Sequence, residues 1–371
     1  MAAVAIAFAA GQWGQGETPA PQPTPVAAAG EVIDSPSLVA LKMVDSNVGW
    51  ALDAHLGEIF AVVRTDDGGR TWRDVSPNHH VNAAFFLDRD HAWALIVQRV
   101  GASAEVQARV YWTQDAGRSW KAGSVLDGAY PMGQLTFADA QHGWFAQTRR
   151  ISDGSQEVAI FRTADSGLTW RQMSATIADD RASETERLPE SCHKTFLVLD
   201  RARGFATGSC RGGLPFLFRT EDGGATWRRQ VLLVPGESGQ VGVCVCSVSG
   251  PTFPTANDGF IAVWGDVRAV YATHDGGVTW QQAGWPADAG PSGIKFVDAL
   301  HGWLSDARDI YGTTDGGATW THLSRVLDGG PLSFISPTEG WAWLRHGWEE
   351  KGPAALVHTT DGGRTWAVVN P

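Results

Sequence analysis

One eight-residue pattern, Thr-x-Asp-x-Gly-x-Thr/Ser-Trp, occurs seven times in the 371-residue chain and constrains its fold more than any other feature. The copies run over residues 65–72, 113–120, 163–170, 220–227, 273–280, 313–320 and 359–366. Successive copies are spaced 40 to 57 residues apart, so each repeat holds one supersecondary unit with loops of variable length. Such a unit cannot bury its apolar face alone, and it must therefore pack against its neighbours in the chain.

A second motif precedes each octet and consists of an apolar run, a polar turn and an aromatic residue. These aromatic residues are Trp50, Trp93, Trp144, Phe205, Phe260, Trp303 and Trp341. Two apolar runs around a polar turn are typical of a hairpin, so each repeat predicts four strands, A to D, with the octet as the turn between C and D. In the first repeat these strands cover residues 38–44, 49–54, 58–65 and 71–75. The pattern predicts an all-β, seven-bladed β-propeller of four-stranded antiparallel blades.

Composition and charge agree with this prediction. The 44 glycines suit many tight turns and the 18 tryptophans suit many small cores. The formal net charge of -11 repels nucleic acid and anionic membrane surfaces at long range. We therefore expect no nucleic-acid partner.

The octet residues have a predicted structural role. The aspartates should accept hydrogen bonds from backbone N–H groups of the turn, and the tryptophans should anchor each turn to its blade. The aspartates are Asp67, Asp115, Asp165, Asp222, Asp275, Asp315 and Asp361. The tryptophans are Trp72, Trp120, Trp170, Trp227, Trp280, Trp320 and Trp366.

These octets resemble the Asp-box (BNR) repeats of sialidases, the sortilin ectodomain, xyloglucan-hydrolysing glycosidases and the photosystem II stability/assembly factor family. Seven units with both motifs in one chain are most similar to the last group, over about residues 38–369. The resemblance implies an assembly-factor-like scaffold that binds another protein, a membrane-associated client included. It also implies that the Asp boxes are structural, because in those families they lie on the blade rim away from the binding mouth.

The chain divides into three predicted parts. Residues 1–10 form an apolar segment that is typical of a secretion signal but lacks the usual basic leader, as expected if the start codon is assigned too late or the chain is shortened. Residues 11–37 are rich in Pro and Ala and predict a disordered linker. Residues 38–371 form the propeller. We therefore expect an extracytoplasmic monomer, either secreted, periplasmic or tethered to the cell surface.

The four cysteines agree with an oxidising compartment. Cys192 and Cys210 flank a hairpin-like stretch, where antiparallel partners face each other, so a disulfide between them is a reasonable prediction. Cys244 and Cys246 point the same way along one strand at a separation too large for a bond between them, so each needs another partner. A zinc site is the alternative, although no C-x-x-C pair is present.

Candidate binding residues are those that depart from the repeat within the D-to-A and B-to-C connections, where propellers usually bind. Each of them is otherwise an ordinary solvated loop residue, although the two tryptophans are plausible platforms for a protein or a sugar. The set comprises Tyr130, Arg149, Arg150, Arg181, Arg187, Trp285, Trp348 and Glu349.

The sequence leaves catalysis open and favours a non-catalytic role, with no catalytic residue, metal or cofactor expected. A P-loop and an H-E-x-x-H motif are both missing. By the family resemblance a sialidase needs a tyrosine nucleophile, and Tyr130 is the only tyrosine outside a repeated strand position. A carbohydrate-active propeller, either a glycoside hydrolase or lectin-like with a glycan partner, is the alternative, because the separation of two carboxylates cannot be read from the sequence.

Overall fold

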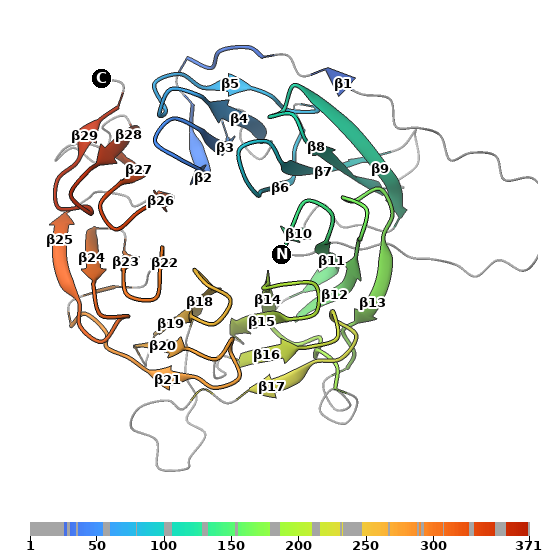
Figure 1. The fold of residues 1–371 in the computed structure, drawn as a ribbon. Coiled ribbons are helices and arrows are strands. Elements are labelled where there is room, and N and C mark those ends of the chain that lie inside the picture. Colours follow the sequence, from blue (N-terminus) through green and yellow to red (C-terminus); the bar gives the residue numbers. More distant parts are fainter. Residues whose placement is uncertain are drawn as a thin grey trace, which may run out of the picture.

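Each repeat folds into one antiparallel sheet whose four strands follow the order of the chain. The computed structural model describes residues 26–27, 30–34, 36–54, 60–78, 80–99, 106–127, 133–152, 155–178, 186–209, 216–230, 232, 247–265, 268–287, 289–290, 293–306, 308–325, 330–345 and 354–369. Seven sheets stand around a common centre, with strand A innermost and strand D outermost in each (Figure 1). The predicted all-β, seven-bladed propeller is confirmed.

The blades are numbered by repeat. Blade 1 contains β2 (Leu38–Met43), β3 (Gly49–Asp53), β4 (Ala61–Thr65) and β5 (Arg73–Asp74), and blade 2 contains β6 (Ala83–Phe86), β7 (Ala92–Arg99), β8 (Val106–Thr113) and β9 (Ser119–Asp127). Blade 3 contains β10 (Gly133–Phe137), β11 (Gly143–Ser152), β12 (Ser155–Arg162) and β13 (Arg171–Ala175), and blade 4 contains β14 (His193–Val198), β15 (Gly204–Ser209), β16 (Phe216–Thr220) and β17 (Arg228–Gln230). Blade 5 contains β18 (Ser247–Thr252), β19 (Gly259–Trp264), β20 (Ala269–Thr273) and β21 (Gln281–Gln282), and blade 6 contains β22 (Gly293–Phe296), β23 (Gly302–Ser305), β24 (Asp309–Thr313) and β25 (Thr321–Arg325). Blade 7 contains β26 (Leu332–Phe334), β27 (Gly340–Arg345), β28 (Ala354–Thr359) and β29 (Ala367–Val368).

Aromatic rings stack between neighbouring blades and form much of the core. The last residue of strand A in one blade stacks on the first aromatic residue of strand B in the blade before it. The ring centroids are 3.7 Å apart for Trp93 and Phe137 and 3.6 Å apart for Trp303 and Phe334. Burying two rings in this way removes large apolar areas from water at every junction where both residues are aromatic.

The glycine that precedes the strand B aromatic in six of the seven blades makes room for this arrangement, and blade 2 has Ala92 at this position. A Cβ atom on Gly302 would lie 2.5 Å from the ring of Phe296, which is closer than a real contact allows. The polar turn therefore needs glycine here for packing, because a side chain would displace the stacked ring.

The indole N–H groups connect the blades as well. Trp93 Nε1 donates to Ser166 O at 2.7 Å, and Trp303 Nε1 donates to Gly362 O at 2.8 Å, so each reaches the octet turn of the next blade. In the other direction, Trp120 Nε1 of the blade 2 octet donates to Val75 O of blade 1 at 2.6 Å. The octet tryptophans of blades 1 to 4 are buried, whereas Trp280, Trp320 and Trp366 are only partly buried.

The ring closes between blade 7 and blade 1 without a shared sheet, since each blade is built from one continuous stretch of chain. Side-chain bonds hold this seam instead. Trp341 Nε1 donates to Gly68 O at 3.0 Å, and the Met43 amide donates to Ser333 Oγ at 2.8 Å. The seam thus repeats the indole-to-octet contact found between blades 2 and 3 and between blades 6 and 7.

Part of the predicted linker pairs with the outside of the ring. Strand β1 (Val26–Ala27) adds to the outer edge of β9 in blade 2. Residues 30–33 run along β5 of blade 1, where Ile33 N donates to Trp72 O at 2.9 Å and Asp74 N donates to Glu31 O at 2.7 Å. This edge segment spans the outer edges of two blades and adds no closing strand to the ring (Figure 1). Residues 1–25 lie outside the described part.

No helix long and apolar enough to cross a membrane occurs in the described part of the chain.

Candidate binding surface

The Asp boxes are closed networks of hydrogen bonds within their own eight residues. In the blade 7 box, Thr359 Oγ1 donates to Asp361 Oδ1 at 2.8 Å, and Thr365 donates through its amide and its hydroxyl to Asp361 Oδ1 and Oδ2 at 2.9 and 2.6 Å. The same bonds recur in the other six boxes. Each carboxylate is thus occupied by its own turn, which leaves little of it for a ligand.

These bonds favour the ionised carboxylate. The hydroxyl and the amide of Thr365 lower the pKa of Asp361 to about 2, against an opposing effect of desolvation. The A-to-B turns use a similar device, since Asp298 Oδ1 accepts the amides of Leu300 and His301 at 2.8 and 2.7 Å. His301 Nδ1 lies 2.9 Å from Asp298 Oδ2, so this histidine is part of the turn.

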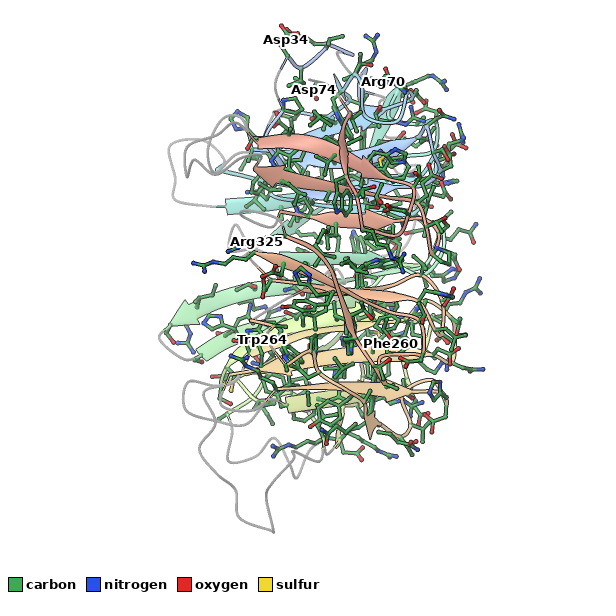
Figure 2. All side chains as sticks on the ribbon, turned by 90° about the vertical axis from the view of Figure 1, so that its left-hand side faces the viewer. Asp34, Arg70, Asp74, Phe260, Trp264 and Arg325 are labelled. Atoms are coloured by element: carbon green, nitrogen blue, oxygen red, sulfur yellow. The ribbon has the colours of Figure 1, made fainter. Side chains whose placement is uncertain are left out.

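The two kinds of turn lie on one face of the ring and the other connections lie on the opposite face. In Figure 2, Phe260 at the start of a strand B and Arg70 of an octet lie toward one side, whereas Trp264 and Arg325, the last residues of a strand B and a strand D, lie toward the other. The candidates that the structure describes, Arg149, Arg150, Arg187 and Trp285, belong to this second face or its connections.

Several of these candidates form hydrogen bonds or ion pairs with neighbouring residues of the chain. Arg149 of β11 donates from Nη2 to Gln172 Oε1 at 3.0 Å. Arg150 is exposed and lies 3.6 Å from Glu157 and 3.8 Å from Glu190, so its charge is partly balanced. Arg187 is half-buried. Tyr130, Arg181, Trp348 and Glu349 lie outside the described residues, so their roles stay predictions.

Trp285 is partly buried, whereas a binding platform would expose the face of its ring. It is partly buried against the apolar cluster of blades 5 and 6, together with Trp264 and Ala283. Its Nε1 donates to Ala289 O at 3.4 Å, and Arg268 donates to the same carbonyl at 2.8 Å. These contacts assign Trp285 a packing role and leave only part of its ring for a partner.

Cys192 is buried and is not a free thiol. Cys210, Cys244 and Cys246 lie outside the described residues, so the pairing of Cys192 with Cys210 stays a prediction. Among the residues that are described, no three His, Cys, Asp or Glu side chains gather closely enough to hold a metal ion.

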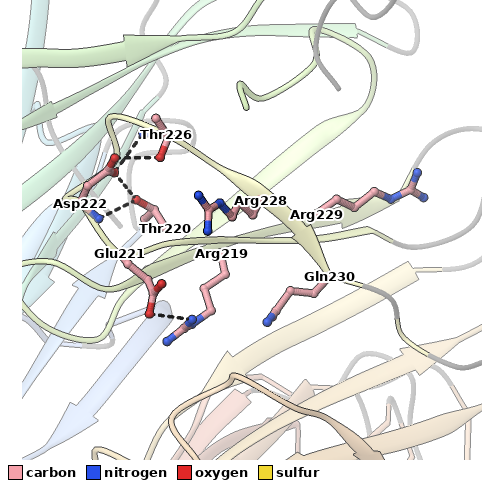
Figure 3. Close-up of a pocket in the computed structure, with 8 residues that line it drawn as sticks. All are labelled: Arg219, Thr220, Glu221, Asp222, Thr226, Arg228, Arg229 and Gln230. Carbon is pink, nitrogen blue, oxygen red and sulfur yellow. Dashed lines mark hydrogen bonds and ion pairs between the residues drawn. The ribbon is translucent and has the colours of Figure 1, made fainter. Parts of the chain in front are cut away.

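A polar cavity lies on the outer side of blade 4, and sequence reasoning did not find it. Its volume is 390 Å³, and it is lined by Arg219, Thr220, Glu221, Asp222, Thr226, Arg228, Arg229 and Gln230 (Figure 3). Strands β16 and β17 build it, because their antiparallel register sets Arg219 opposite Arg228 and Phe218 opposite Arg229. The cavity therefore rests on two paired strands and on the octet turn that joins them.

Hydrogen bonds fix most of the cavity wall. Arg219 Nη1 donates to Glu221 Oε1 at 2.9 Å, and Arg228 Nε donates to Glu186 Oε1 at 2.8 Å. Gln230 Nε2 donates to Gly277 O of blade 5 at 2.8 Å. Arg229 is exposed and has no hydrogen-bond or ion-pair partner among the described residues, so its guanidinium is available to a ligand.

The two carboxylates of this cavity are already engaged. Desolvation opposes ionisation of Asp222, but hydrogen bonds from Thr226 and Thr220 outweigh it and lower the pKa of this carboxyl. Glu221 is paired with Arg219. The cavity therefore presents cations to a ligand and offers no free pair of acids for general acid–base chemistry. The Arg-Arg pair directly after the blade 4 octet is the sequence signal that could have indicated it, because no other octet is followed by two basic residues.

Fold and surface together define a seven-bladed Asp-box β-propeller. Residues 278–370 match the model of a family described as photosynthesis system II assembly factor YCF48. Among solved structures, the chain is similar to YCF48 bound to D1 peptide, with 16% identity over 97% of each chain and a TM-score of 0.55. It is also similar to YCF48 from Cyanidioschyzon merolae, with 14% identity over 92% of this chain and 97% of that one and a TM-score of 0.56.

A carbohydrate-active enzyme shares the fold too. The GH74 xyloglucanase from Xanthomonas campestris is 12% identical over 94% of this chain and 56% of its own, with a TM-score of 0.57. No curated protein matches the sequence. These findings confirm the resemblance predicted from the octets, and at such identities the structural likeness concerns the fold.

Proposed function

We propose that this protein is a non-catalytic scaffold that binds a segment of another protein, in the manner of an assembly factor. The observation that carries the proposal is the cavity of blade 4, which is lined by three arginines on paired strands; Arg229 has no partner among the described residues, and its guanidinium extends away from those of Arg219 and Arg228 (Figure 3). Guanidinium groups recognise carboxylates through paired N–H donors, and groups held on rigid strands lose little entropy on binding. An acidic peptide segment fits this chemistry.

The comparisons support the same proposal. The C-terminal repeats match the YCF48 assembly-factor family, and one similar structure holds a peptide of another protein. Only this similarity to the assembly-factor family supports a membrane-associated client, which we include in the proposal.

We test the proposal with the full chain and a labelled peptide, acetyl-Glu-Ala-Glu-Ala-Glu-amide, against its Gln counterpart. The acidic peptide should bind and the Gln peptide should not. Arg229→Gln should weaken binding about tenfold, because a charge-assisted hydrogen bond contributes about 1.5–3 kcal/mol and 1.4 kcal/mol is a factor of ten. Arg171→Gln is the matched control, since Arg171 is the first strand D residue of blade 3 and lies outside the cavity. Equal binding of both peptides, or equal losses in both variants, would contradict the assignment.

A carbohydrate-active propeller is the alternative, and the xyloglucanase with the same fold is the reason to test it. The protein is incubated with xyloglucan, microbial glucans and sialosides, and the products are analysed. Turnover that a single Asp or Glu substitution abolishes would replace the scaffold proposal.

We also propose that the protein acts outside the cytoplasm, with the apolar residues 1–10 serving in export and the segment after them as a tether to the propeller. The buried Cys192, which is not a free thiol, supports an oxidising compartment. Mass spectrometry of unreduced peptides should recover Cys192 joined to Cys210. A Cys192 peptide joined to Cys244 or Cys246 would correct the pairing.

A further inference from the structure

The inner strands place one residue of each blade at the same height around the ring centre. Each of these axial residues is paired with the first aromatic residue of strand B in its own blade, and together they are Lys42, Phe85, Thr136, Leu197, Thr252, Lys295 and Ser333. On β22 the exposed residues Gly293 and Lys295 alternate with the buried residues Ile294 and Phe296. Within the described part of the chain no strand lies inside strand A, so this exposure means that water reaches the ring centre.

Only two of the seven axial residues are charged, and both are lysines. Lys42 belongs to blade 1 and Lys295 to blade 6, and Ser333 holds the equivalent position in blade 7 between them. The three blades are neighbours in the ring, so these residues lie in one sector of its inner wall, and the Lys42 side chain reaches from there to blade 2 (Figure 1).

This sector offers hydrogen-bond donors that the protein does not use. Lys42 Nζ donates to Phe86 O and Leu87 O, both at 2.8 Å, which leaves one of its three N–H groups. Lys295 forms no hydrogen bond or ion pair with any residue in the described ranges, so all three of its donors are free. Ser333 Oγ accepts the Met43 amide at 2.8 Å, and its own O–H is therefore left to donate.

The two lysine charges of this sector are poorly solvated and repel each other. Burial lowers the pKa of Lys42, the carboxylate of Asp88 opposes this effect, and the charge of Lys295 adds to it. Protein atoms crowd around the Lys295 ammonium even though water reaches it, and this loss of solvation lowers its pKa as well. Asp88 is already engaged, since its Oδ1 accepts the amides of Asp90 and His91 at 2.9 Å. Two cations that repel each other where solvation is poor destabilise the fold unless an anion neutralises part of their charge.

We propose that Lys42, Lys295 and Ser333 form a binding site for a small oxyanion or carboxylate at the axis of the ring. The donors are two ammonium groups and a hydroxyl, without an acceptor among them, which is the chemistry that phosphate and a peptide C-terminal carboxylate share. The site is separate from the cavity of blade 4, so it neither requires nor excludes the proposed function.

The chain has five lysines, which makes a direct test simple. The full chain is labelled with 15N-lysine, and its five backbone amide signals are followed during titration with inorganic phosphate at constant ionic strength. The amides of Lys42 and Lys295 should shift and saturate, whereas that of the exposed Lys121 on β9 should not. Acetyl-trialanine with a free carboxylate and its amide form a second pair of probes. Saturation by phosphate or by the free peptide supports the site, and the two arms distinguish a free oxyanion from a chain terminus.

Two variants complete the test. Lys295→Met should reduce phosphate affinity at least tenfold, and Lys121→Met should leave it unchanged. Because Lys295 has no partner to lose among the described residues, Lys295→Met should also raise the melting temperature in phosphate-free buffer of low ionic strength. Shifts that rise linearly without saturation, shifts that are equal at Lys121, or binding that Lys295→Met does not weaken would each overturn the proposal.

Discussion

Replacing Trp341 by Phe tests whether the seam of the ring is held like the junction between blades 6 and 7. Trp341 is buried, and its Nε1 donates to Gly68 O across the seam at 3.0 Å. Phenylalanine already occupies the same position at Phe205 and Phe260, so this substitution suits the local backbone and packing. The substitution removes the indole N–H group and the buried surface area of the second ring of the indole.

The expected loss of stability is about 2–4 kcal/mol. Loss of the hydrogen bond with an unsatisfied buried carbonyl costs about 1–3 kcal/mol. The smaller ring adds about 1 kcal/mol through lost burial and an imperfectly filled site. Unfolding in guanidinium followed by far-UV circular dichroism measures the change without depending on the fluorescence of the lost tryptophan.

Trp303→Phe is the matched control, because Trp303 Nε1 makes the same bond to Gly362 O between blades 6 and 7. The two variants should lose similar stability. Amide exchange should be faster on both sides of the affected junction, in blades 7 and 1 for Trp341→Phe and in blades 6 and 7 for Trp303→Phe. A change below about 0.5 kcal/mol for Trp341→Phe would refute the conclusion that this bond closes the ring.

Three further predictions concern the glycine turns, the Asp boxes and the edge segment. Gly302→Ala should destabilise the fold by about 1–3 kcal/mol because its Cβ would meet the Phe296 ring at 2.5 Å, whereas Gly293→Ala, which has open space around it, should change stability by less than about 0.5 kcal/mol; equal values in denaturant unfolding would contradict the packing argument. The pKa of Asp361 is lowered from 3.8 to about 2, so its stabilising effect is present above about pH 4 and is lost as the pH falls through about 2; Asp361→Asn should therefore flatten the decline of unfolding free energy over this range, and an unchanged pH profile would count against it. Ile33→Pro should release the edge segment from β5 by removing its bond to Trp72 O, seen as faster proteolysis near residue 30, whereas Val32→Pro removes no such bond among the described contacts and should have a smaller effect; identical proteolysis of both variants would argue against the pairing.

Blade number and strand order could be predicted from the sequence, because the interactions that set them are local. The hydrogen bonds of an Asp box close within eight residues, so Thr359, Asp361 and Thr365 identify the turn wherever they occur at this spacing. The turn then fixes where strand C ends, which is Thr65 in blade 1 as predicted. Strand limits were less certain, and in blade 1 the predicted strands 38–44 and 71–75 shorten to Leu38–Met43 and Arg73–Asp74.

The sites depended on contacts between residues far apart in the chain. Trp285 is a candidate platform by its loop composition, which does not reveal that it packs against the apolar cluster of blades 5 and 6. Arg229 was overlooked because it lies on a strand, whereas the prediction considered only connections.

The sequence by itself determined the repeating unit, the number of blades and the turn chemistry, since each of these is settled within a few neighbouring residues. Only the tertiary structure decided which side chains share a space. Arg219 meets Arg228 through strand pairing, and Lys42 approaches Lys295 because the ring closes with blade 7 between blades 6 and 1. Closure depends on buried rings and indole hydrogen bonds between blades, which bring together residues that no local pattern connects.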